Sequence, residues 1–402
     1  MFKKIVVGIS GGVDSAVAAL FLRNKGFNVT GVFMKNWDIK DETGVCQVEE
    51  DYEHAQWLCD KIKIPLVEAN FVKEYWNHIF CYLTEQYENG RTPNPDVLCN
   101  KLIKFDHFYK FARTELRADA IATGHYVRTS FGSYLERFVP NADVKLYRAR
   151  DKKKDQTLFL SQVPQEALRS SMFPLGDYLK TDVKQIAREA GLDVIVRKKE
   201  SYGICFVGKR NFPSFISEYI PEKPGELVDL DDGRVVGNHS GFHHWTVGQR
   251  LKLPNHQFRY FVYKKDAETN NIIVVRGTNH PALYTDFLTT EPPHWISSEP
   301  KEFTSFGRML NCHFRFQHKD SLVPCIVHKD SKNQLLIRIN QPLRAITNGQ
   351  FAVLYNDEEC LGSAAITYCG PSYFSLGREL RSEDQNQKLD EGQKQTADRT
   401  IC

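Results

Sequence analysis

A short glycine turn, Ser10-Gly11-Gly12-Val13-Asp14-Ser15, is the first segment whose residue types could bind a ligand. Its glycines let backbone N–H groups converge, its serines add hydroxyl donors, and the N-terminus of a following helix favours an anion. The turn has neither the Gly-Lys-Ser/Thr of a Walker A loop nor the GxGxxG pattern. Without the Walker lysine, it is better suited to holding pyrophosphate as a leaving group than to γ-phosphoryl transfer. A turn that only connects a strand to a helix would not need both serines and the aspartate.

Cys99 and Cys205 are the two thiols whose neighbours could make them reactive. Asn94-Pro95-Asp96 is typical of a helix start, with Asn94 as N-cap and Pro95 at the first helical position. Cys99 would then lie near a helix N-terminus, where the helix dipole stabilises a thiolate. Cys205 lies in a strand-like run, 202–207, and is flanked by cations that could lower a thiol pKa: Lys198, Lys199, Lys209 and Arg210. The plain alternative for each cysteine is a small buried hydrophobic residue.

The composition limits the classes of protein that these groups could serve. The chain has 402 residues, of which 41% are hydrophobic and 26% charged, which indicates a globular protein of two or three domains. Its 53 basic and 50 acidic residues nearly balance, so any nucleic-acid site must be a local patch. The ten cysteines contain no CxxC pair, which argues against a structural zinc site. No apolar run approaches the roughly 20 residues of a membrane helix.

An alternation of strands and helices must position the glycine turn and Cys99. Strand-like runs at 4–9, 29–33, 66–69 and 119–123 alternate with helical patterns that start at Val13, end before Pro65, and cover 72–87. Such alternation predicts a parallel sheet covered on both faces, which is the α/β class. The pattern becomes hairpin-like after residue 126, and a last helix is expected at 181–190. We therefore expect a first domain over residues 1–200.

Short strands separated by Gly, Asp, Asn and Pro turns follow over about 202–277 and again over about 303–374. They predict a small, mostly β central domain at 201–280 and a C-terminal β-barrel domain at 281–377. Pro292-Pro293 and Pro300 would mark the joint between these two modules. Residues 378–402 lack aromatic residues and are rich in Gln, Asp, Glu and Lys, which is typical of a disordered tail.

Longer motifs surround the candidate residues: GVFMKNW at 31–37, GRTPNPDVLCNKLIKF at 90–105, ATGHY at 122–126, KDQTLFLSQV at 154–163 and ESYGICFVGKRNF at 200–212. Together with SGGVDS, they resemble the tRNA-specific 2-thiouridylases of the PP-loop ATP pyrophosphatase superfamily. The resemblance runs from residue 3 to about residue 377, and segments such as KEYWN and HFRF are most similar to the mitochondrial members. It implies a Rossmann-like PP-loop domain followed by the two β domains.

The resemblance implies that the glycine turn binds ATP, with Mg²⁺ accompanying the nucleotide. The matching positions are Gly8, Ile9, Ser10, Gly11, Gly12, Val13, Asp14, Ser15, Met34 and Gly124. In this interpretation the protein alone fixes no metal, although Asp14 could orient the loop or help to hold Mg²⁺. The plain alternative for Asp14 is an acid that stabilises the first turn of a helix.

The resemblance also implies a tRNA partner, bound through the anticodon stem-loop of a Lys-, Glu- or Gln-type tRNA. The matching positions are Asn94, Pro95, Asp96, His125, Lys154, Asp155, Gln156, Arg315, Phe316 and Gln350. Basic and aromatic neighbours such as Arg315-Phe316 suit a splayed loop, because phosphates need charge and unstacked bases need a π-face. Asp96 would hold the edge of the flipped base or act as an acid or base, and its plain alternative is a first-turn acid.

In the family's reaction, adenylation turns the C2 oxygen of the wobble uridine into a leaving group, and sulfur then attacks C2. By resemblance, Cys205 accepts sulfur as a persulfide from an upstream donor protein, and Cys99 is the nucleophile that frees it through a transient Cys99–Cys205 disulfide. Attack by free hydrosulfide is the alternative route. Two other interpretations of the chain remain: a different PP-loop adenylating ligase, which would need neither cysteine, and a noncatalytic RNA-binding relative.

The first residues of the chain give an indication of the cellular compartment in which the protein works. The first strand begins at about Lys4, which leaves no room for a secretory signal, so most thiols are expected to stay reduced. The resemblance predicts a mitochondrial protein, although no Arg- and Ser-rich presequence precedes the first strand. A cytoplasmic location is the alternative.

Overall fold

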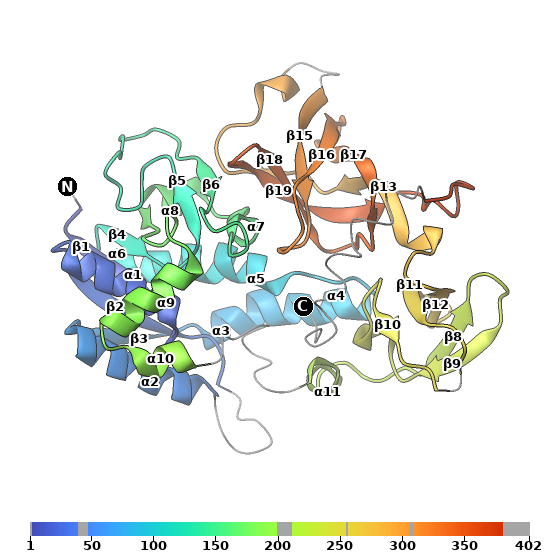
Figure 1. Cartoon of the computed structure of the whole chain (residues 1–402), viewed down its shortest axis with the longest axis horizontal. Helices are drawn as coiled ribbons and strands as arrows, with labels where there is room; N and C mark the ends of the chain where they lie inside the picture. The colour runs from blue at the N-terminus through green and yellow to red at the C-terminus, as the bar shows by residue number, and fades with distance from the viewer. Residues whose placement is uncertain (1, 39–46, 199–210, 255, 305–308, 381–402) are drawn as a thin grey trace.

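The computed structural model describes residues 2–38, 47–198, 211–254, 256–304 and 309–380. Figure 1 shows an α/β domain at one end, a β-barrel above, and a second β-sheet at the other end, with α4 and α5 between them. None of the described helices is both long enough and apolar enough to span a membrane.

β1 (Lys4–Ile9) lies in the middle of a parallel sheet. The sheet has five strands in the order β3-β2-β1-β4-β7, and each neighbouring pair is parallel. The other strands are β2 (Asn28–Lys35), β3 (Leu66–Asn70), β4 (Ala120–Ala122) and β7 (Ser171–Met172). Residues 5–9 of β1 are buried because both faces of the sheet are covered. The sequence prediction of a parallel α/β sheet is confirmed.

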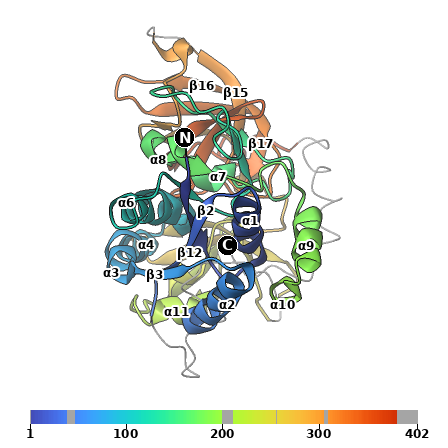
Figure 2. The same ribbon diagram turned by 90° about the vertical axis from the view of Figure 1, so that its left-hand side faces the viewer.

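Helices cover both faces of this sheet. Figure 2 shows α3, α4 and α6 on one side, and α1 and α9 on the other. The helices are α1 (Val13–Asn24), α2 (Gln47–Ile62), α3 (Val72–Tyr75), α4 (Cys81–Glu88), α5 (Pro95–Leu98), α6 (Phe108–Thr114), α7 (Thr157–Leu160), α8 (Gln165–Arg169), α9 (Lys180–Glu189) and α10 (Asp193–Arg197). Two π-helical segments, η1 (Trp76–Phe80) and η2 (Cys99–His107), join α3 to α4 and α5 to α6. Residues 72–88 and 95–114 are therefore two continuous helical runs.

The central domain is a mixed five-stranded sheet in the order β10-β11-β12-β8-β9. Its strands are β8 (Gly225–Asp229), β9 (Val235–His239), β10 (Arg250–Leu251), β11 (Tyr260–Asp266) and β12 (Asn271–Arg276). A helix, α11 (Phe212–Ser217), precedes this sheet in the domain that the sequence predicted to be mostly β. Pro213 opens α11, and the buried residues Phe212, Phe215 and Ile216 follow a helical spacing.

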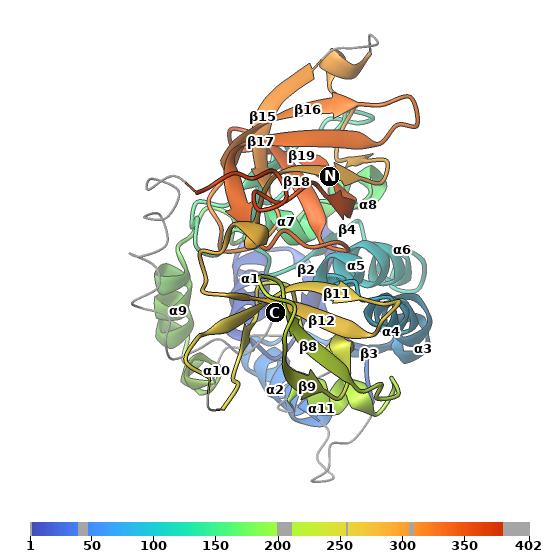
Figure 3. The same cartoon turned by 90° about the vertical axis from the view of Figure 1, so that its right-hand side faces the viewer.

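The C-terminal domain is an antiparallel barrel, shown above the central sheet in Figure 3. Its strands, in the order in which they pair, are β13 (Tyr284–Thr290), β17 (Leu335–Arg344), β16 (Val323–Lys329), β15 (Met309–Arg315), β18 (Phe351–Asn356) and β19 (Glu359–Cys369). Pairing of β13 with β19 closes the ring, which confirms the predicted barrel. The predicted joint at Pro292-Pro293 and Pro300 is wrong, because β13 lies before these prolines and β14 (His294–Trp295) pairs with β19 between them.

A hairpin from the first half of the chain extends the barrel sheet. β5 (Val127–Thr129) and β6 (Leu146–Arg148) pair with each other, as the sequence after residue 126 predicts. β6 also pairs with β19, with Leu146 opposite Cys360. The α/β domain and the barrel therefore share one continuous β-sheet.

The predicted disordered tail, 378–402, lies mostly outside the described residues, which end at residue 380. Leu380 is buried in a small cluster with Val275, Leu283 and Tyr284, at the joint between the central sheet and the barrel. The first residues of the predicted tail therefore pack against the folded domains.

Candidate active site

The glycine loop joins β1 to α1 at the carboxyl end of the parallel sheet, the edge at which open α/β sheets bind ligands. Gly12 is the N-cap of α1 and has extended backbone angles. Gly11 has a φ of +70°, and a Cβ there would lie 2.6 Å from the carbonyl oxygen of Asp51. The Ser15 hydroxyl donates to the Gly12 carbonyl at 3.1 Å and accepts from the Ser10 N–H at 3.2 Å. The loop is therefore fixed before any ligand enters.

Met34 lies on β2, and Gly124 lies in the segment that follows β4; β2 and β4 are the two strands that flank β1. A Cβ on Gly8 would lie 3.1 Å from the Met34 methyl group. A Cβ on Gly124 would lie 2.7 Å from the backbone of Asp14 and Ser15, so only glycine lets this segment approach the start of α1. The structure thus brings the predicted ATP-binding residues, including buried Ile9 and Val13, together at one edge of the sheet.

Asp14 is held by two side chains that the sequence reasoning missed. Lys180, the first residue of α9, places Nζ 2.7 Å from both carboxylate oxygens of Asp14. The Tyr126 hydroxyl donates to Asp14 Oδ1 at 2.8 Å. Lys180 and Asp14 are 166 positions apart, so no local signal in the sequence connects them. We call Asp14, Lys180 and Tyr126 the loop cluster.

The helix start that carries Cys99 forms as predicted. Asn94 is the N-cap of α5, its Oδ1 accepts from the Val97 N–H at 3.3 Å, and Pro95 is in the first turn. Cys99 follows at the first residue of η2 and is 5% exposed. Asp96 and Cys99 are three positions apart, which places an acid and a thiol on one face of the helical run.

The burial of the Asp96 carboxyl group is only partly compensated by a nearby charge. Burial raises the pKa of its carboxyl group, and the positive charge of Lys104 only partly opposes this rise. Asn100, one turn further, donates from Nδ2 to the Asp96 carbonyl at 2.9 Å. Among the described residues, the buried Oδ1 of Asn100 has no hydrogen-bond partner. When it is protonated, the Asp96 carboxyl group can donate a hydrogen bond to a nucleobase edge, and the Asn100 amide oxygen can accept one. Sequence reasoning missed Asn100.

His125 lies close to this helical run but is closed off from solvent. Its Nδ1 is 2.8 Å from the Thr123 hydroxyl, and its ring packs near Phe105. Burial, with a smaller contribution from Lys104, holds the pKa of His125 well below its usual value of 6.5. The imidazole is therefore neutral near pH 7 and does not offer positive charge to RNA.

Gln350 connects the barrel to the helix start. Its Nε2 donates to the Thr92 carbonyl at 2.8 Å, and its Oε1 accepts from Asn94 Nδ2 at 3.4 Å. Two predicted tRNA contacts, Asn94 and Gln350, thus touch each other although 256 positions separate them, and Pro95 follows Asn94 directly.

A second group of predicted tRNA contacts lies inside the junction between the α/β domain and the barrel. Asp155 is 0% exposed and Arg315 is 2% exposed, with 2.8 Å between Asp155 Oδ2 and Arg315 Nη2. Arg315 also donates to the Tyr355 hydroxyl at 2.7 Å. Thr157 donates to both carboxylate oxygens of Asp155 at 3.0 Å. We call Asp155, Thr157, Arg315 and Tyr355 the junction cluster.

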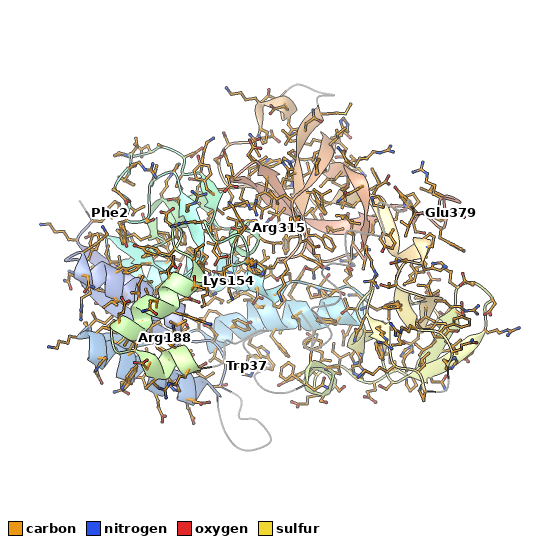
Figure 4. All side chains as sticks on the ribbon, in the orientation of Figure 1. Phe2, Trp37, Lys154, Arg188, Arg315 and Glu379 are labelled. Carbon is orange, nitrogen blue, oxygen red and sulfur yellow. The ribbon has the colours of Figure 1, made fainter. Side chains whose placement is uncertain are left out.

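Asp155, Arg315 and Phe316 are buried against other parts of the protein, and their contact with tRNA stays a prediction. Phe316 is 2% exposed and packs in the core of the barrel. Gln156 accepts from the Tyr126 backbone N–H at 2.9 Å, which links the junction to the loop cluster. Figure 4 shows Lys154 and Arg315 on the two sides of this junction. Lys154 is the predicted contact of this group that keeps a partly exposed cation.

Cys205 and the predicted strand that contains it lie outside the described residues. The described chain before this segment ends at Lys198, whose Nζ is 2.5 Å from Asp51 Oδ1, and the backbone of Asp51 adjoins Gly11. The chain resumes at Asn211, and Phe215 of α11 packs on Trp37 after β2. Both ends of the segment that carries Cys205 are therefore anchored on the α/β domain.

No group of three His, Cys, Asp or Glu side chains suited to a metal ion occurs within the described parts of the chain. Asp14 is the carboxylate at the glycine loop, and Mg²⁺ commonly binds proteins through one or two carboxylates together with substrate phosphates. Its side chain is 35% exposed and can reach such an ion, so the loop fits a metal that arrives with a nucleotide.

The fold and the site define a nucleotide-binding α/β protein with two appended β domains. The matching family models are the tRNA methyl transferase HUP domain at residues 3–209, the tRNA methyl transferase PRC-barrel domain at 213–276, and the aminomethyltransferase beta-barrel domain at 285–366.

Relatives of known name match almost the whole chain. A Drosophila melanogaster protein named mitochondrial tRNA-specific 2-thiouridylase 1 is 49% identical and covers 92% of this chain and 95% of its own length. The Homo sapiens protein of the same name is 45% identical, with 94% of each chain covered. A tRNA-specific 2-thiouridylase from Alkaliphilus oremlandii is 43% identical, with 90% of this chain and 96% of its own covered. The chain belongs to the tRNA-specific 2-thiouridylase family.

Proposed function

We propose that this protein is an ATP-dependent tRNA sulfurtransferase that forms 2-thiouridine at the wobble position of the anticodon. The observation that carries the proposal is the helix start at residues 94–100, which carries Asp96 and Cys99 in the same domain as the glycine loop and whose N-cap, Asn94, contacts Gln350 of the barrel. The names of the relatives that cover more than nine-tenths of the chain support it.

The first step activates the uridine. The C2 oxygen of the base attacks the α-phosphorus of ATP, the bond from this phosphorus to the bridging oxygen breaks, and pyrophosphate leaves with the electron pair. The N-terminus of α1 and the loop hydroxyls stabilise the charge on the leaving group. Asp96, whose raised pKa keeps it protonated to higher pH than usual, donates a hydrogen bond to the extruded base.

The second step transfers sulfur. The terminal sulfur of a Cys205 persulfide, supplied by a donor protein, attacks C2, and AMP leaves with the C2 oxygen. Cys99 as a thiolate then attacks Sγ of Cys205, which breaks the persulfide S–S bond, releases the thiolated base and forms a Cys99–Cys205 disulfide. A thiol reductant restores both cysteines. In the alternative order, Cys99 attacks first and hydrosulfide reaches C2.

Other aspects of the proposal concern cofactors and location. Asp14 holds Mg²⁺ together with the phosphates of ATP.

We place the protein in mitochondria because the animal relatives carry that name. Lys-, Glu- and Gln-type tRNAs are the proposed substrates. Fractionation of cells that express the tagged protein tests the location, and recovery in the cytosol alone contradicts it.

Mass spectrometry of tRNA incubated with the protein, ATP, Mg²⁺ and a persulfide donor tests the activity. We expect a gain of sulfur at the wobble uridine, which should fall at least about 1,000-fold for Cys99→Ser and for Cys205→Ser, as for other removed nucleophiles. Cys81→Ser is the matched control because Cys81 is an exposed free thiol, and it should keep full activity.

The outcomes separate the competing functions. Normal thiolation by both serine variants would overturn the roles of the two cysteines. Pyrophosphate release without thiolation of any tRNA would favour another adenylating ligase. Binding of tRNA without pyrophosphate release would favour a noncatalytic RNA-binding relative.

A further inference from the structure

The glycine loop contains no lysine, yet phosphate-binding loops of the Walker type use one to reach the β- and γ-phosphates. In this protein a lysine reaches the loop from elsewhere in the chain. Lys180 at the start of α9 binds both carboxylate oxygens of Asp14, each at 2.7 Å, and Asp14 is in the first turn of α1. The ammonium group therefore lies next to the helix N-terminus that would receive an anion.

The two members of this ion pair differ in exposure. The Lys180 side chain is 10% exposed, whereas the Asp14 side chain is 35% exposed. A largely buried ammonium requires a counter-charge, and Asp14 supplies it in the ligand-free loop. Because the Asp14 side chain is partly exposed to solvent, a phosphate group can approach the Lys180 ammonium from the side of the glycine loop. The ammonium can then bind the phosphate and the Asp14 carboxylate together.

The Lys180 ammonium group lies where three separate elements meet. Asp14 belongs to α1, Lys180 to α9, and Tyr126 to the segment that follows β4. The Tyr126 hydroxyl donates to Asp14 at 2.8 Å, and Lys180 Nζ lies 5.8 Å from the centre of the Tyr126 ring. Such a preorganised charge needs little rearrangement when negative charge develops on a ligand.

We infer that Lys180 is the phosphate-binding cation of the glycine loop, and that Asp14 and Tyr126 position it. This inference rests on the proposed function for the identity of the nucleotide. When the bond between the α-phosphorus and the bridging oxygen breaks, the electron pair passes to pyrophosphate, and the Lys180 ammonium stabilises that charge. No proton leaves Lys180 in this step.

Kinetics of pyrophosphate release with tRNA and ATP test this role. Lys180→Met should lower kcat/KM for ATP by about 100-fold, the usual loss when one charge-stabilising group is removed. Lys180→Arg should recover at least a tenth of the normal rate because it keeps the charge. Lys110→Met is the matched control: Lys110 pairs with Asp106 at 2.6 Å, but its side chain is 65% exposed, and its helix, α6, lies across the sheet from α1 and α9 (Figure 2). It should leave kcat and KM unchanged.

A second measurement does not depend on turnover. ATP should raise the melting temperature of the wild-type and Lys110→Met proteins, because a ligand that binds the folded state stabilises it. The shift should be lost in Lys180→Met, and it should largely return in Lys180→Arg. Equal ATP shifts and equal kcat/KM for wild type and Lys180→Met would overturn the inference. A wild-type protein that binds ATP but never releases pyrophosphate would instead overturn the proposed function, while the ATP shifts still decide the role of Lys180.

Discussion

The loop cluster and the junction cluster use the same chemical groups for different purposes. Each contains an aspartate, a long cationic side chain and a tyrosine hydroxyl: Asp14, Lys180 and Tyr126 in one, and Asp155, Arg315 and Tyr355 in the other. The Asp14 side chain is 35% exposed, whereas Asp155 is 0% exposed. Exposure of the acid therefore separates a cluster that can receive a ligand from one that only joins two domains.

The choice of cation follows from this difference. The rigid plane of the Arg315 guanidinium fixes Nη2, which is the atom that contacts Asp155, Thr157 and Tyr355. Lysine is a compact charge whose three N–H donors have no fixed plane, so the Lys180 ammonium can keep Asp14 as a partner and also donate to a phosphate.

The two clusters should differ most in stability when each of them loses its cation. Arg315→Met leaves the buried carboxylate of Asp155 without its ion-pair partner and should cost about 3–5 kcal/mol of unfolding free energy. Lys180→Met leaves Asp14 open to water and should cost about 1 kcal/mol or less. Urea unfolding of both variants measures the difference. Equal losses would show that exposure does not separate the two clusters.

A smaller difference is expected when the two tyrosines lose their hydroxyl groups. Tyr355→Phe removes an acceptor for the buried guanidinium of Arg315 and should cost about 1.5–3 kcal/mol. Tyr126→Phe removes one donor to a carboxylate that water can still reach and should cost about 1 kcal/mol or less. Thermal melts of the pair compare these losses, and a larger loss for Tyr126→Phe would contradict the assignment.

The smallest effect concerns Asp96, an acid for which burial outweighs its one favourable charge. Its pKa is raised from 3.8, so over the pH range just above 3.8 the folded state holds more protons than the unfolded state. Wild-type stability should therefore fall as the pH rises through that range. Asp96→Asn removes this contribution, so the variant should gain stability relative to wild type as the pH rises from 3.5. Urea unfolding at several pH values measures this gain, and a difference that does not change with pH would refute it.

Local rules account for the parts of the molecule that the sequence predicted well. β1 has the predicted bounds, Lys4–Ile9, because a β-branched run followed by a glycine turn is an unambiguous strand signal. The helix at Asn94 begins as predicted because its N-cap and proline act within four residues. The glycine loop was recognisable for the same reason.

Contacts between residues that are far apart in the sequence account for the features that the sequence did not predict. Arg148 and Lys152 both pair with Glu358 of the barrel, which lies more than 200 positions further along the chain. Nothing near Lys180 in the sequence points to Asp14, and nothing near Phe316 announces that the barrel core covers it. Such pairings depend on the packing of whole domains, which a single sequence does not reveal.

The hairpin of β5 and β6 has one edge that the barrel covers. β6 forms hydrogen bonds with β5 on one side and with β19 on the other. A protein cut near residue 200 would present β6 as an unpaired edge, which is a template for intermolecular strand pairing. The same cut would remove Arg315 from the buried carboxylate of Asp155. The barrel therefore supplies the α/β domain with a partner for the β6 edge and with the counter-charge of Asp155.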